Sequence, residues 1–291
     1  MFEAVFGAKW SLVLATVIEG LLLTTVAANS RAHAGPLVVV IDAVRSRPVL
    51  RLRLGLNSNA STTACGAQSI GGCLVSLTLY SHPFASYCQK VLIALWENEV
   101  PFTYRHLEEP GAAEERAALW PLGRFPVLVD DGRTIAESSI IIEHLDLHHT
   151  GPVQLLPRDR DAALEVRFMD RFFDNYVMTA MQKPVSEALR AEATRKEEAM
   201  AEARQALDTA YAWLEERLSG RTWAAGENFT MADCAAAPSL FYADWVHQIG
   251  PDFPRLRNYR SRLLARPSFA RAVDEARPYR PYFPLGAPDR D

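Results

Sequence analysis

The sequence predicts an α/β domain followed by an all-helical domain, both preceded by a disordered N-terminal extension. Between residues 76 and 150, short apolar strands alternate with amphipathic helices, and two strands flank an Asp-Gly turn. After residue 157, apolar residues recur at helical spacing only. Residues 55–72 are rich in Asn, Ser, Thr and Gly, which predicts no packed structure there. A length of 291 residues with 49% hydrophobic side chains suffices for two cores.

Charge and cysteine content favour a small-molecule partner inside a reducing compartment. The net charge is -4, and no run of Lys and Arg indicates a nucleic-acid partner. The four cysteines form no Cys-x-x-Cys pair and no zinc-site spacing with histidine. We therefore expect free thiols and a cytoplasmic location.

The first 75 residues leave three interpretations open. Residues 10–28 are an apolar run followed by Ala32-His33-Ala34, which is similar to a signal-peptide cleavage site. Glu19 within the run makes export or membrane insertion the least favoured interpretation. The alternatives are a disordered natural extension and a stretch outside the working protein. We expect no membrane association, and we expect the chain from Ser76 to fold alone.

Each element of the α/β domain has a local signal. The expected order is a strand at 77–80, a helix at 87–98, a strand at 102–107, a weak helix at 112–119, strands at 126–130 and 133–136, and a helix at 137–147. Asp131-Gly132 predicts a two-residue hairpin turn. Ser138 and Ser139 are expected to cap the last helix.

The helical domain begins with two long amphipathic segments, at 160–182 and 185–218, which we expect to be antiparallel neighbours. Thr230 and Asp233 form an acidic capping box, which predicts the start of a buried helix. Shorter helices follow around 255–265 and 268–276.

Three segments of the chain resemble cytosolic glutathione transferases of the bacterial type. They are LYSHPFASYCQKVLIAL, WPLGRFPVLVDDGRTIAESSIIIEHL and NFTMADCAAAP. The resemblance implies a thioredoxin-like domain at 76–150 that binds glutathione, and an all-helical domain at 157–291 that completes a second-substrate pocket. It also implies a homodimer, glutathione as co-substrate without a permanently bound cofactor, and a small hydrophobic electrophile as the other substrate.

Two short motifs are expected to hold glutathione. Phe125-Pro126 enters a strand, and an X-Pro bond is where a cis peptide costs little. A cis bond there would expose the Val127 N–H and C=O to the cysteinyl part of glutathione. Glu137-Ser138 opens a helix, whose N-terminus attracts a carboxylate. By the resemblance, Ser138 holds the γ-glutamyl carboxylate and Glu137 faces its ammonium group, although Ser138 could also simply cap the helix.

The loop after the first strand departs from the family pattern. Relatives carry a cysteine at its start or a serine or cysteine further on, whereas here His82 and Ala85 fill these places. Ser86 is the nearest hydroxyl, so Ser86 or the N–H groups of the helix start are expected to lower the pKa of the bound thiol. His82 is a further candidate donor, and a structural role is its alternative.

A second-substrate pocket is predicted from Phe84, Phe172 and Tyr176, although aromatic residues at this spacing suit a core or a dimer interface equally well. No metal site is predicted, because His148 and His149 are adjacent and point apart on a helix.

Three functions remain open at this point. The first is conjugation of the glutathione thiolate to a small electrophile. The second is glutathione-dependent reduction of peroxides or disulfides, which needs no protein cysteine. The third is a binding protein that keeps the fold without the chemistry, and the absence of a reactive group at Ala85 makes it credible.

Overall fold

The computed structural model describes residues 77–190 and 198–291, which fall within one compact unit. The expectations for residues 1–75, including the apolar run and the disordered extension, lie outside the described residues. Within the part that is described, no helix combines the length and the apolar character needed to cross a membrane.

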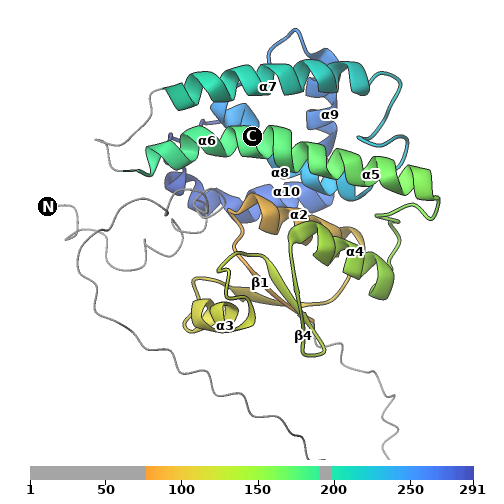
Figure 1. The fold of residues 1–291 in the computed structure, drawn as a ribbon, viewed down its shortest axis with the longest axis vertical. Coiled ribbons are helices and arrows are strands. Elements are labelled where there is room, and N and C mark those ends of the chain that lie inside the picture. The colour runs from red at the N-terminus through yellow and green to blue at the C-terminus, as the bar shows by residue number, and fades with distance from the viewer. Residues whose placement is uncertain (1–76, 191–197) are drawn as a thin grey trace, which may run out of the picture. The chain divides into compact units, whose positions relative to one another are not determined.

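A four-stranded mixed sheet forms the base of the α/β part (Figure 1). Its strands are β1 (Leu77–Ser81), β2 (Thr103–His106), β3 (Val127–Asp130) and β4 (Arg133–Ala136), in the order β2-β1-β3-β4. β1 pairs with β2 in parallel, and the other two pairs are antiparallel. The parallel pair requires a crossover, which a helix supplies.

Three helices accompany the sheet: α2 (Ser86–Glu97), α3 (Ala112–Leu119) and α4 (Ser138–His148). Residues 88–95 of α2 are all buried, because this helix lies between the sheet and the helical part of the chain. The turn between β3 and β4 follows the prediction, since Asp131 and Gly132 both have positive φ, 45° and 81°. That geometry matches the twist of an antiparallel hairpin.

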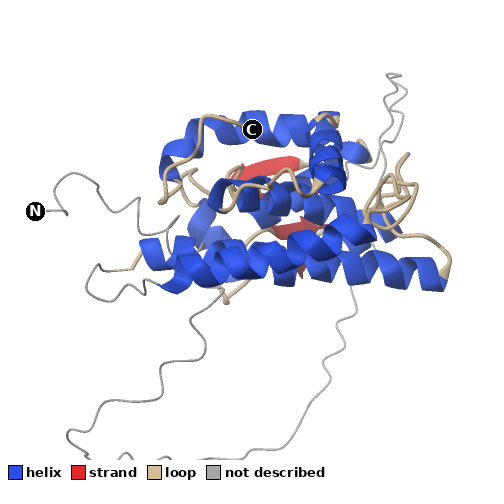
Figure 2. Cartoon of the chain, turned by 90° about the horizontal axis from the view of Figure 1, so that it is seen from above, coloured by secondary structure: helices blue, strands red, loops and turns tan. Residues whose placement is uncertain are grey.

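In the rest of the described chain, helices joined by loops make up the named elements, as Figure 2 shows. Its elements are α5 (Arg160–Phe172), the π-helical η2 (Phe173–Met178), α6 (Thr179–Ala188), α7 (Glu198–Arg217), α8 (Met231–Val246), α9 (Pro254–Leu264), α10 (Pro267–Ala276) and the 3-10 helix η4 (Arg277–Tyr282). Every residue of α8 is buried. An α/β part followed by an all-helical part confirms the predicted fold class.

The capping box at the start of α8 is present as predicted. The Asp233 carboxylate accepts hydrogen bonds from the Thr230 N–H at 2.8 Å, the Ala224 N–H at 2.9 Å and the Tyr259 hydroxyl at 2.6 Å. Asp233 is fully buried, and burial raises the pKa of its carboxyl. One side chain therefore fixes the helix start and ties it to α9.

The predicted boundary between the segments 160–182 and 185–218 is wrong. α5, η2 and α6 follow one another without interruption, and Pro184 lies inside α6. A proline within a helix costs about 3 kcal/mol through its missing N–H and its ring clash. Pro184 and its neighbours Val185 and Ser186 are buried, so packing against the core outweighs that local preference.

Candidate functional site

A cavity of about 580 Å³ lies where the α/β part meets the helical part. Its walls come from α2, the segment between α3 and β3, the start of α4, and the α5–η2–α6 helix. The residues that line it include Tyr87, Arg124, Phe125, Pro126, Glu137, Ser138, Asp170, Arg171, Asp174 and Asn175. Four of the sequence-predicted glutathione residues thus share one cavity.

The Phe125-Pro126 peptide bond is cis, as predicted, and both residues line the cavity. Val127 lies in β3, where it pairs with Tyr80 on one side and Ala136 on the other. Its side chain is fully buried, and it is not among the residues that line the cavity. The contact between Val127 and a ligand stays a prediction.

Helix α4 begins differently from the prediction. The residue before its first turn is Glu137, with φ 71° and ψ 118°, and no side chain caps the helix. Ser138 is the first helical residue and Ser139 the second, so the predicted capping by these serines is wrong. A positive φ at a residue other than Gly costs about 1 to 3 kcal/mol and is concentrated at functional sites. This backbone places both Glu137 and Ser138 in the cavity wall.

A buried network of charges forms one side of the cavity. The Lys90 ammonium of α2, 1% exposed, lies 2.6 Å from Asp170 and 2.8 Å from Asp174. It also donates to the Ser139 hydroxyl at 2.9 Å, and that hydroxyl donates to Asp170 at 2.8 Å. Arg171 contacts both carboxylates at 2.7 and 2.6 Å. Burial raises the pKa of Asp174, and the Lys90 charge opposes that shift.

Sequence reasoning did not identify this network. Asp170 and Asp174 are four residues apart in an otherwise apolar helix face, and Lys90 precedes a continuous apolar run. A charged residue at a position that the helical period assigns to the core is a signal for a buried ion pair. That signal could have indicated all three residues, although not their pairing across 80 positions of sequence.

The loop after β1 places a phenol, and not Ser86, in the cavity. Ala85 is the residue before α2 and has extended geometry, so Ser86 is the first helical residue. Ser86 is not among the lining residues, whereas Tyr87 is. Burial raises the pKa of the Tyr87 hydroxyl, and the Asp174 carboxylate adds to this effect. Tyr87 therefore keeps its proton at neutral pH and can donate a hydrogen bond.

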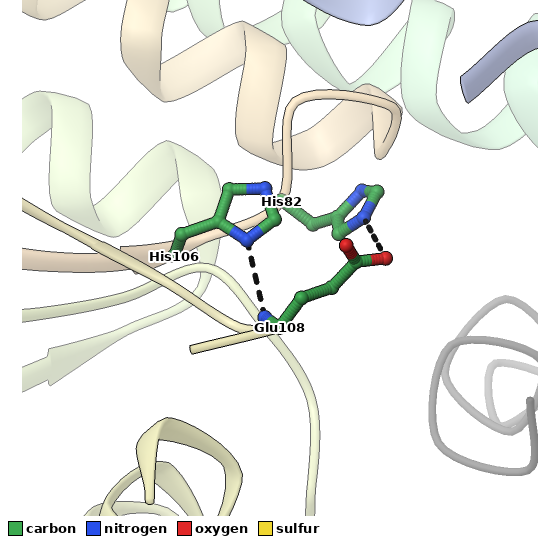
Figure 3. Close-up of side chains that lie close together, drawn as sticks. All are labelled: His82, His106 and Glu108. Atoms are coloured by element: carbon green, nitrogen blue, oxygen red, sulfur yellow. Dashed lines mark hydrogen bonds and ion pairs between the residues drawn. The ribbon is translucent and has the colours of Figure 1, made fainter. Parts of the chain in front are cut away.

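His82 is not among the residues that line the cavity, and its ring lies beside His106 and Glu108, near the end of β2 (Figure 3). Its Nδ1 accepts the Phe84 N–H at 3.2 Å, and its Nε2 lies 3.4 Å from Glu108. Burial lowers its pKa to about 4, and His106 adds to the shift. His82 is thus neutral at physiological pH and has the contacts of a structural residue; its predicted catalytic role stays a prediction.

The described cysteines are free and buried. Cys88 Sγ accepts the His82 N–H at 3.4 Å, and burial raises the pKa of its thiol to about 12. Burial also raises the pKa of Cys234. Neither thiol is ionised at neutral pH, so neither can act as a nucleophile. Cys65 and Cys73 lie outside the described residues.

The three residues predicted for a second-substrate pocket do not share one cavity. The Phe84 ring contacts Tyr242 at a centroid distance of 5.5 Å and lines neither cavity. Phe172 and Tyr176 line a separate cavity of about 800 Å³, where Phe172 stacks on Trp213 at 4.2 Å. The two cavities share Asn175 and Thr179 as wall residues. The α5–η2–α6 helix therefore separates two spaces.

Comparisons with known proteins agree with this arrangement. The sequence profile described as "Glutathione S-transferase, N-terminal domain" matches residues 79–153, and that described as "Glutathione S-transferase, C-terminal domain" matches residues 169–267. FtsZ-localized protein A of Caulobacter vibrioides is 31% identical over 206 residues, which are 67% of this chain and 90% of that protein.

Two solved structures with glutathione-type ligands are similar. One is a glutathione S-transferase of Methylobacterium radiotolerans in complex with glutathione sulfonate, which is 31% identical with a TM-score of 0.59. The match covers 68% of this chain and 94% of that chain. The other is a glutathione S-transferase of Methylobacillus flagellatus with glutathione bound, which is 26% identical with a TM-score of 0.61. The match covers 68% of this chain and 98% of that chain.

Proposed function

Since this chain belongs to the glutathione S-transferase family, we propose that it binds glutathione in the 580 Å³ cavity and conjugates its thiolate to a small electrophile. The observation that carries the proposal is the shared wall: Phe125, Pro126, Glu137 and Ser138 line one cavity. The names of two similar structures mention glutathione or its sulfonate as a bound ligand, which supports the same ligand here. The domain limits of 76–150 and 157–291 remain part of the proposal.

The charges of the cavity suit the two ends of a γ-glutamyl group. Ser138 opens α4, whose unpaired N–H groups and positive dipole end favour a carboxylate. Glu137 supplies a negative charge next to it for an ammonium group. In this arrangement the cysteinyl part of glutathione lies beside Phe125 and Pro126, because those residues continue the same wall.

Activation of the thiol falls to the start of α2. A thiol with an ordinary pKa near 8.5 is only a few per cent ionised at pH 7. The first N–H groups of α2 have no partner within the helix, and the Tyr87 phenol stays protonated as a donor. We assign Tyr87 the stabilising hydrogen bond to the thiolate, with Ser86, the candidate from the sequence, as the alternative.

Replacing Ser138 by alanine should weaken glutathione binding by about 1 to 3 kcal/mol, because the ligand carboxylate loses a charge-assisted hydrogen bond. Isothermal titration calorimetry of the full chain measures this difference directly. Ser219→Ala serves as the matched control, since Ser219 is exposed and is not among the residues of the cavity wall. Equal affinities for Ser138→Ala and the unchanged protein would remove Ser138 from the binding site.

A binding protein without catalytic turnover is the second candidate. Ala85 carries no reactive group, and a similar protein is named for its localisation with FtsZ and not for a reaction. Glutathione binding without turnover on electrophiles, peroxides or disulfides would favour this candidate. Turnover on peroxides or disulfides alone would favour the glutathione-dependent reductase.

We also propose a homodimer. The large apolar side chains of Leu164, Phe168 and Tyr176 are 65%, 46% and 61% exposed and follow one another at spacings of four and eight along one helix. Such a stripe is typical of an interface. Light scattering should give twice the chain mass of 32.4 kDa for the unchanged protein and a smaller mass for Phe168→Glu. An unchanged mass for Phe168→Glu would place any interface elsewhere.

A further inference from the structure

Among the described residues, two clusters of histidine and carboxylate side chains lie outside the cavity. In each, three possible ligand atoms lie within 4.8 Å of one another. One consists of His82, His106 and Glu108, drawn in Figure 3, and the other of Asp130, His144 and His149. They differ in how hydrogen bonds fix the ring nitrogens, and this difference decides which cluster can hold a metal ion.

Backbone hydrogen bonds occupy the first cluster. Nδ1 of His82 accepts the Phe84 N–H at 3.2 Å, and Nδ1 of His106 accepts the Glu108 N–H at 3.1 Å. A ring nitrogen that accepts carries no proton, so in each neutral ring the proton is on Nε2. These Nε2 atoms face Glu108 at 3.4 Å and the Tyr279 hydroxyl at 3.2 Å, which suits N–H donors. This cluster is a hydrogen-bonded group and has no lone pair directed at a metal.

The second cluster brings two imidazoles to one carboxylate oxygen. Nε2 of His144 and Nε2 of His149 each lie 2.7 Å from Oδ2 of Asp130. The three side chains are 10%, 14% and 13% exposed, so the group is shielded yet reachable from solvent. Unlike the rings of the first cluster, these two rings do not accept a backbone N–H at Nδ1, so their tautomers are free to adapt.

The end of α4 creates this convergence. On a continuous helix, two residues five apart would point about 140° away from each other. His149 follows the last turn of α4 with φ -131° and ψ 55°, so it leaves the helix. Its ring thereby returns to the carboxylate that His144 contacts. The adjacency of His148 and His149 in the sequence does not reveal this geometry.

We propose that Asp130, His144 and His149 form a binding site for a divalent transition-metal cation, with Zn²⁺ as the best match. Two imidazole nitrogens and one carboxylate oxygen are ligands that Zn²⁺ prefers, and a fourth ligand completes its tetrahedral shell. The exposed His148 is close enough to supply this fourth ligand, since the centroid of its ring lies 4.5 Å from that of the His144 ring. The C-terminus of α4 adds the negative end of a helix dipole, which favours a cation.

The ligands need only a small adjustment. Tetrahedral ligands at the usual zinc distances are about 3.3 Å apart, whereas the nitrogen-to-oxygen distances here are 2.7 Å. Side-chain rotation at partly exposed positions can supply the difference. A bound cation would replace two hydrogen bonds by three coordinate bonds and would join the end of β3 to the end of α4. The opposite end of α4 borders the cavity proposed for glutathione.

Titration of the chelator-treated full chain with zinc chloride tests the site. Calorimetry should show binding that His149→Gln weakens at least about 100-fold, more than the loss typical of outer-shell partners of a metal site. The matched control is His247→Gln, which removes another histidine paired with an aspartate, Asp208, at 2.7 Å. The control should bind zinc with unchanged affinity. Zinc at about 100 times the dissociation constant should raise the melting temperature by roughly 5 to 10 °C.

Three results would overturn the proposal. They are the absence of zinc binding by the unchanged protein, unchanged zinc affinity in both His149→Gln and Asp130→Asn, and loss of binding only in His106→Gln. Cobalt in place of zinc distinguishes cysteine ligands from histidine and aspartate ligands. A thiolate-to-metal absorbance band would show that cysteine binds the ion and would contradict the assignment. A melting curve of His149→Gln without zinc shows whether that variant is folded, and Asp130→Asn provides the second test if it is not.

Discussion

Replacing Lys90 by methionine should lower the free energy of unfolding by about 3 to 5 kcal/mol, the range for removing one partner of a buried ion pair. The methionine keeps most of the side-chain volume, so the loss comes from charge. Without the ammonium group, Asp170 and Asp174 face each other with only Arg171 to compensate them. Urea denaturation followed by circular dichroism measures the difference.

The matched control is Lys183→Met, because Lys183 pairs with Glu202 at the surface, where both side chains are about half exposed. Surface pairs contribute about 0 to 1 kcal/mol, so this variant should be nearly as stable as the unchanged protein. Adding Asp170→Asn and Asp174→Asn to Lys90→Met should restore part of the lost stability. A loss below about 1 kcal/mol for Lys90→Met would show that Arg171 alone neutralises the two carboxylates.

Replacing Tyr87 by phenylalanine should lower kcat/KM for conjugation by roughly 10- to 1000-fold. This range is expected when the glutathione thiolate loses one stabilising hydrogen-bond donor. The phenol lies in the cavity wall and keeps its proton, because burial and the Asp174 charge raise its pKa. Rates with 1-chloro-2,4-dinitrobenzene measure the effect. Thiolate absorbance of bound glutathione at neutral pH should fall in the same variant.

Two companion variants make the Tyr87 experiment decisive. Tyr176→Phe removes a phenol that lines the other cavity only, so its rate should stay normal. Ser86→Ala tests the assignment made from the sequence. A large loss for Ser86→Ala alone would restore that assignment. Normal rates in both Tyr87→Phe and Ser86→Ala, together with a lowered pKa of the bound thiol, would assign activation to the N–H groups of α2. Absence of any glutathione thiolate in the complex would favour the binding protein.

Features set by neighbouring residues were predictable from the sequence. The turn at Asp131-Gly132, the capping box of Thr230 and Asp233 and the cis bond before Pro126 each depend on two to four consecutive positions. Their geometry is decided by local sterics and local hydrogen bonds, which residue identity reveals.

Features that depend on distant partners were not predictable in the same way. Ser139 looked like a helix cap, but Asp170, 31 positions later, accepts its hydroxyl. The segments 160–182 and 185–218 were expected to be separate, but Pro184 between them lies buried inside α6. Lys90 pairs with Asp174 across 84 positions. Such pairings follow from the packing of α2 against the helical part, which no local pattern contains.

The π-helical segment Phe173–Met178 bears on how this chain is compared with others of its fold. A π turn holds about one residue more than an α turn, so it accommodates an inserted residue without rotating the helix on either side. A related chain without that residue would keep α5 and α6 in the same positions and need a one-residue gap between positions 173 and 178. A sequence alignment without this gap would then match Asp174, or every residue after it, to the wrong residue of the related chain, although the folded helices coincide.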